Sequence, residues 1–196
     1  MNKFVAAGKT GLLCAALCVM LLGSGCSLFG VVYIPDKALQ SAVRASLGKP
    51  LGILTRSDLR GIQEIQAPNL NIKNLEGLQH CESLTVLNLR GNQVLSLSPL
   101  NGLTNLVRVD LGDNRVQVIE AVAGWFFLEE LRLDGESNDI WDWQPLVANA
   151  QAGGLGAGNV VVLPARTTLD ANGGALPGFA AAQQVLLEKG VALSIL

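Results

Sequence analysis

Apolar residues in the middle of the chain recur with a step of 22 residues, and this repeat limits the fold more than any other feature. The first apolar position of the unit is occupied by Leu84, Leu106 and Leu128. The same step relates Leu87 to Val109 and Leu131, Leu89 to Leu111 and Leu133, and Leu84 back to Ile62. A fourth unit fits once two additional residues are allowed within 134–137. Residues 62–149 therefore form four successive units of one pattern.

Each unit reads L-x-x-L-x-L-x-x-N-x-V/I-x-x-L-x-x-L. The L-x-L segment alternates with period two, which predicts a short strand with every second side chain directed inward. One unit cannot bury its own apolar face, but stacked units share a continuous core. The pattern predicts an α/β solenoid with parallel strands on the concave face. An inward Asn92, Asn114 or Asn138 would satisfy backbone groups where the chain leaves each strand, and the first unit has Leu70 there.

The flanking segments have the patterns expected of caps that cover the ends of a solenoid. In 33–61, an amphipathic helix is expected to begin near Pro35 or Asp36 and to end at Gly48, and residues 55–59 predict a second, short helical turn. In 150–196, we expect a strand at 160–163, a helix at 179–189 that stops at Gly190, and a closing strand at 191–196. The predicted caps are thus an N-terminal helical cap and a C-terminal helix-strand cap.

The stretch Leu84-Thr85-Val86-Leu87-Asn88-Leu89-Arg90-Gly91-Asn92-Gln93-Val94 resembles the 22-residue class of bacterial internalin-type leucine-rich repeats. The segment 143–149 resembles the final repeat of such proteins, and the resemblance covers roughly residues 33–196. It implies a leucine-rich-repeat horseshoe, with 3₁₀ or irregular segments on the convex side, that acts by binding and catalyses no reaction.

The N-terminus has the pattern of an export signal. Lys3 and Lys9 precede an apolar run at 12–22 that is short for a membrane-spanning helix. The sequence Leu-Gly-Ser-Gly-Cys at 22–26 resembles the bacterial lipobox, which implies a signal peptide at 1–25, a lipidated Cys26 and a short tether at 26–32. The expected location is the bacterial cell envelope, and Ser27 in place of Asp favours the outer membrane in a diderm host. Ordinary signal cleavage that leaves Cys26 free is the alternative.

Composition excludes several functional classes. Without residues 1–25 the chain has 12 Lys and Arg against 16 Asp and Glu, a net charge of −4 that disfavours nucleic acid as a partner. Cys14 and Cys18 leave with the signal and Cys26 carries the lipid, so Cys81 has no cysteine with which to form a disulfide. His80 is the only histidine and is expected in an exposed turn, beside a Cys81 that points into the core. We therefore expect no catalytic residues, metal site, cofactor or small-molecule substrate.

The repeat register defines which strand residues point outward. These form a mainly polar strip of mixed charge, hereafter the strand-face strip. It consists of Glu64, Gln66, Val86, Asn88, Arg90, Arg108, Asp110, Glu130, Arg132 and Asp134. Repeat proteins bind partners through such surfaces. The hypothesis is a non-enzymatic surface lipoprotein that binds a protein partner in adhesion or recognition. The alternatives are a solvated face without a partner and a structural envelope scaffold without an external ligand.

Aromatic residues fall at other positions of the repeat. Trp125 and Trp143 occupy inward positions and are predicted in the core. Trp141 occupies an outward position and is added to the candidate partner-binding residues. Phe126 and Phe127 are expected to be covered by the C-terminal cap or the convex segments, and an exposed contact patch is the alternative. Glycan binding by exposed rings is disfavoured because these rings do not line the strand face.

The inserted loop at 134–139 is acidic and rich in oxygen atoms. Such a loop could suit a hard cation such as calcium, but it lacks the ligand spacing of an EF-hand. We expect a solvated loop without a metal.

Overall fold

The computed structural model describes residues 30–196, of which Val31–Leu196 form one compact unit. The predicted signal peptide and the lipidation of Cys26 lie outside the described residues. Within the described part, no helix is long and apolar enough to cross a membrane.

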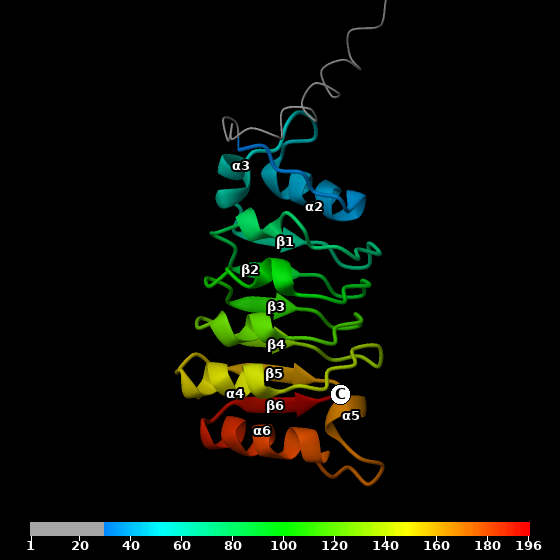
Figure 1. Cartoon of the computed structure of the whole chain (residues 1–196), viewed down its shortest axis with the longest axis vertical. Coiled ribbons are helices and arrows are strands. Elements are labelled where there is room, and N and C mark those ends of the chain that lie inside the picture. Colours follow the sequence, from blue (N-terminus) through cyan, green and yellow to red (C-terminus); the bar gives the residue numbers. More distant parts are fainter. Residues whose placement is uncertain (1–29) are drawn as a thin grey trace, which may run out of the picture. The chain divides into compact units, whose positions relative to one another are not determined.

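One open parallel sheet of six strands runs through the unit, with the strands in chain order (Figure 1). The strands are β1 (Glu64–Gln66), β2 (Val86–Asn88), β3 (Arg108–Asp110), β4 (Glu130–Arg132), β5 (Val160–Leu163) and β6 (Ala192–Ile195). From β1 to β4 each residue pairs with the residue 22 positions later, as in Glu64 with Val86 and Val86 with Arg108. The predicted α/β solenoid with parallel strands is confirmed.

The segments that return from one strand to the next are short helices. Three are 3₁₀ helices, η1 (Leu78–His80), η2 (Ser98–Leu100) and η3 (Glu120–Gly124), as the resemblance implied. The fourth is an α-helix, α4 (Gln144–Gln151), with Pro145 in its first turn. The connection from β4 to β5 is longer than 22 residues, since Glu130 pairs with Val160, and it has room for two full helical turns.

The inward positions of all units form one buried core. Trp125 is fully buried and Trp143 is 2% exposed, so both are core residues as predicted. The ring of Trp143 packs edge-on against Phe179 of α6 (Pro177–Glu188), with centroids 5.3 Å apart. This contact joins the last repeat to the C-terminal cap.

Buried asparagines satisfy the backbone where the chain leaves each strand, as predicted. These residues are Asn92, Asn114 and Asn138. In the third unit, Nδ2 of Asn114 donates to the carbonyls of Leu89 and Leu111 at 2.9 and 3.1 Å. Its Oδ1 accepts the backbone N–H of Val94 at 3.1 Å. Each amide therefore links its own unit to the preceding one.

The N-terminal cap consists of α2 (Lys37–Leu47) and α3 (Arg56–Arg60). Asp36 accepts the backbone N–H groups of Ala38 and Leu39 at the start of α2. Gly48 ends α2 at φ 60°, a left-handed conformation that glycine adopts at low cost. Both helix ends lie where the sequence predicted them.

The C-terminal cap contains the expected strand, helix and strand. The sequence analysis did not predict a further short helix, α5 (Ala165–Thr168), which follows β5. Thr168 in this helix is fully buried, and its hydroxyl donates to the carbonyl of Pro164 at 2.7 Å.

Candidate functional site

The strand-face strip crosses β1 to β4 on the outward side of the sheet. Outward and inward side chains alternate, with Ile65 fully buried between exposed Glu64 and Gln66. Arg108 is also exposed, whereas the strip residues Asn88, Arg90, Asp110, Glu130 and Arg132 are partly buried. A shallow hollow of about 160 Å³ lies on this face, lined by Gln66, Val86, Leu87, Asn88, Arg108, Val109, Asp110, Glu130 and Arg132. The structure thus brings most of the predicted strip together around one depression.

Arg90 is the centre of an ion-pair network that joins three units. Its guanidinium lies 3.3 Å from Asp110, 2.9 Å from Asp113 and 2.5 Å from Asp134. Arg132 also approaches Asp134, at 3.5 Å, and Asp110, at 3.9 Å. These charges bind one another, and they fix the side chains along this edge of the strip.

Gly112 makes the long reach of Arg90 possible. Arg90, Gly112 and Asp134 occupy equivalent positions in three successive units, 22 residues apart. A Cβ on Gly112 would lie 2.2 Å from Nη1 and 2.7 Å from Cζ of Arg90. Because Gly112 has no side chain, the guanidinium of Arg90 has room to extend across the third unit.

Asp134 differs from its predicted position on an accessible face. The residue is only 4% exposed, because Arg90 and Arg132 lie against its carboxylate. Burial by itself would raise the pKa of Asp134, but the hydrogen bonds from Arg90 and the charges of both arginines outweigh burial and lower it. The same pairing raises the pKa of Arg90. Asp134 is therefore a buried anion within the strip, and Arg90 and Arg132 are the more accessible members of this group.

The accessible charges of the strip lie around Arg108 and Glu130. Arg108 binds Glu129 at 3.3 Å, and both side chains are 61% exposed. Glu130 lies 3.5 Å from Arg132 and keeps 40% of its side chain exposed. Exposed pairs of this kind contribute little to folding stability, so they can exchange partners at low cost.

The outward face continues beyond the predicted strip with uncharged residues. Val160 pairs with Glu130 and is 37% exposed, and Ala192 follows it on β6. The 22-residue step does not lead to these positions, because the connections to β5 and β6 are longer. The strand-face surface is therefore charged over β1 to β4 and apolar or small over β5 and β6.

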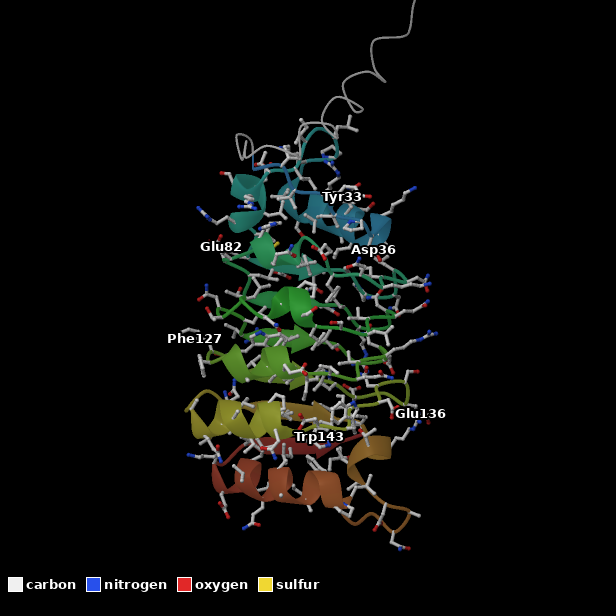
Figure 2. All side chains as sticks on the ribbon, in the orientation of Figure 1. Tyr33, Asp36, Glu82, Phe127, Glu136 and Trp143 are labelled. Carbon is white, nitrogen blue, oxygen red and sulfur yellow. The ribbon has the colours of Figure 1, made fainter. Side chains whose placement is uncertain are left out.

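Exposed aromatic side chains lie outside the strip. Trp141 is 72% exposed and therefore accessible, as predicted, and Leu95, at the equivalent position two units earlier, is 52% exposed. Phe126 and Phe127 are 46% and 62% exposed, so the expectation that a cap or the convex segments cover them is wrong. Figure 2 shows Phe127 pointing away from the stack, whereas Trp143 lies within it. The C-terminal cap packs on Trp143 and leaves these two rings uncovered.

The inserted loop at 134–139 is only partly solvated. Asp134 and Asn138 are buried, and the loop is bound to the C-terminal cap through Arg166, which donates to the carbonyl of Glu136 at 3.2 Å. Among residues 30–196, no three His, Cys, Asp or Glu side chains are grouped so that they could hold a metal ion.

Neither Cys81 nor His80 is placed for nucleophilic chemistry. Cys81 is fully buried, and burial raises the pKa of its thiol to about 12, so the thiol stays protonated at neutral pH. His80 is half-buried and not in an open turn as expected. Burial, followed by the charge of Arg56, lowers its pKa.

Comparisons with known proteins agree with this architecture. Residues 82–124 match the family model described as leucine-rich repeats in two copies. A stretch of 64 residues is 34% identical to the leucine-rich repeat and IQ domain-containing protein 3 of Rattus norvegicus. This match covers 33% of this chain and 10% of the rat protein. The chain carries leucine-rich repeats.

Solved structures of bacterial proteins have a similar fold. Internalin C2 from Listeria monocytogenes is similar with 27% identity and a TM-score of 0.60, over 82% of this chain and 64% of its own. Another internalin from the same species is similar with 24% identity and a TM-score of 0.60, and the match covers 70% of this chain and 46% of the internalin. The chain spans less than two thirds of each relative's length. It folds as an internalin-like leucine-rich-repeat solenoid, a fold that is typically a non-enzymatic module for protein–protein recognition.

Proposed function

We propose that this chain is a non-enzymatic lipoprotein of the bacterial cell envelope that binds a protein partner through the strand-face strip. The observation that carries the proposal is the hollow over β1 to β4, where polar side chains of four units converge on one face. Strands held in a fixed 22-residue register present these side chains at fixed spacing. Such a surface suits recognition of an extended protein surface.

The size of the hollow favours a protein over a small molecule. Its volume of about 160 Å³ is below the roughly 300–1,000 Å³ of typical small-molecule sites. Its rim carries both signs of charge, in Arg108 and Glu130. Complementary charges on a partner would fix its register and speed its association.

A crosslinking experiment in the bacterial host tests the strip. A photoreactive amino acid at Asn88 should form an adduct with a partner, whereas the same amino acid at exposed Gln117, outside the strip, should not. The double variant Arg108→Glu/Glu130→Lys should abolish the adduct, because the rim charges are reversed. The matched control Arg115→Glu/Glu120→Lys changes exposed charges outside the strip and should retain it. Equal adducts from both positions would contradict the proposal.

The anchor is a separate part of the proposal. The lipobox-like sequence at 22–26 supports acylation of Cys26, and Ser27 supports the outer membrane in a diderm host. Wild type should fractionate with membranes, and Cys26→Ala should be released. Protease treatment of intact cells then separates a surface-exposed recognition protein, which is digested, from an envelope scaffold, which is protected. Equal release of wild type and variant would reject the anchor.

A further inference from the structure

The N-terminal cap exposes a group of large apolar side chains that the core does not use. This group, hereafter the cap patch, consists of Val31, Tyr33, Leu51 and Ile53, which are 59%, 74%, 82% and 64% exposed. Figure 2 places Tyr33 beside the helices of the cap. Clusters of exposed apolar side chains mark contact sites.

The backbone holds the cap patch in a defined arrangement. Val31 and Thr55 form an antiparallel bridge, and the N–H of Val32 donates to the carbonyl of Leu54 at 2.8 Å. Successive side chains of paired, extended backbone point to opposite faces. Val32 and Leu54 are therefore buried, while their neighbours Val31 and Ile53 face outward.

Arg44 fixes the loop that carries the other half of the patch. Its guanidinium donates to the carbonyl of Gly52 at 2.8 Å and to that of Lys49 at 3.2 Å. Leu51 and Ile53 flank Gly52, so these hydrogen bonds hold both side chains outward. The patch is a preformed surface and loses little conformational freedom on binding.

The position of the patch in the chain identifies what it contacts. Val31 lies five positions after Cys26 in the chain. An extended chain spans at most about 3.5 Å per residue, so the patch begins within about 18 Å of the Cys26 backbone. If Cys26 carries acyl chains in a bilayer, the tether holds the patch next to the headgroup region.

The small size of the patch favours a lipid surface over a protein. Four side chains are few compared with the roughly 20–30 residues that each partner contributes to a standard protein interface. A surface already tethered to the bilayer needs no interface of that size, because the tether gives a high effective concentration. Tyrosine and aliphatic side chains are also the types that enter the membrane interface.

We propose that the cap patch is a membrane-contacting surface that inserts into the lipid interface and holds the solenoid by its N-terminal end. This proposal rests on the lipid anchor proposed above. The acyl chains give attachment, and the patch gives the attached domain a fixed orientation.

The test uses the full chain, purified from a bacterial host and reconstituted into vesicles of phosphatidylethanolamine and phosphatidylglycerol with brominated acyl chains. Ile53→Cys carries a bimane fluorophore, and the matched control Leu187→Cys carries the same label on exposed α6. Buried Cys81 does not compete for the label. We expect emission from position 53 to fall about twofold relative to unbrominated vesicles, and emission from position 187 to stay unchanged. Adding Tyr33→Ser and Leu51→Ser should remove the quenching while vesicle flotation persists.

The outcomes separate the two proposals. Flotation without quenching at position 53 would overturn the membrane-contacting surface and leave the anchor intact. Absence of flotation would overturn the anchor, and the membrane-contacting surface with it. A position-53 probe already shielded in the absence of vesicles would show that another protein segment covers the patch, which also overturns the proposal.

Discussion

The guanidinium of Arg90 reaches the carboxylate of Asp134 in the second unit beyond its own, with Nη2 2.5 Å from Oδ2. The pair joins residues 44 positions apart, across the intervening Gly112. Because Asp134 is almost fully buried, its charge depends on this contact for compensation. The contact therefore couples the shape of the strand-face strip to the stability of three repeats.

Gly112→Ala should destabilise the protein by about 1–3 kcal/mol, because the added Cβ displaces Arg90 and leaves buried Asp134 with fewer partners. Urea unfolding measures the change. Gly102→Ala is the control, since a Cβ there meets no atom within 4 Å. In an Arg90→Ala background, Gly112→Ala should have little further effect. Full additivity would show that the glycine acts independently of the arginine.

The ion pair also predicts how stability depends on pH. The folded pKa of Asp134 lies below its ordinary value of 3.8, so the folded state binds protons less readily than the unfolded chain. Its contribution is fully present above the unfolded pKa and is lost as pH falls below about 4 toward the folded pKa. Urea midpoints measured from about pH 6 to about pH 3 should fall more steeply for wild type than for Asp134→Asn. Parallel curves would contradict this assignment.

Asp36 connects the N-terminal cap to the first repeat, and a graded pair of variants can separate its two roles. Oδ1 caps α2, while Oδ2 accepts the backbone N–H groups of Lys73 and Asn74 at 2.8 and 3.3 Å. Asp36→Ser retains a capping hydroxyl but is too short to reach the repeat, and should cost about 1–2 kcal/mol. Asp36→Ala should cost about 0.5–2 kcal/mol more. Hydrogen exchange at the Lys73 amide should accelerate in both variants, and unchanged protection would refute the connection.

The sequence determined the repeats and the cap helices because those features depend on local spacing. The register from β1 to β4, the buried asparagines and the start of α2 at Asp36 all follow from residues at fixed distances along the chain. The burial of Asp134 depends on the side chain of Arg90, two units earlier. The outward position of Asp134 in its own unit therefore does not predict that burial. Arg90, Gly112 and Asp134 occupy the same position of three successive units. Two opposite charges on either side of a glycine at this position are the sequence pattern that indicates the ion pair.

Other features could not be predicted because they depend on segments outside the regular repeat. Phe126 and Phe127 are uncovered because the C-terminal cap packs elsewhere, which no local pattern records. The outward position of Val160 depends on a connection longer than 22 residues, whose register only the folded sheet shows.

The asparagine column gives the last prediction. Asn114 is fully buried, and its Nδ2 donates to three carbonyls while its Oδ1 accepts one N–H. Asn114→Asp keeps the shape but replaces a donor by an anion that faces carbonyl oxygens, and should cost about 3–5 kcal/mol at neutral pH. Asn101→Asp at an exposed position should change stability by less than about 0.5 kcal/mol. Part of the loss should be recovered below about pH 5, because protonation removes the buried charge. A loss independent of pH would mean that the missing hydrogen bonds, and not the charge, cause the destabilisation.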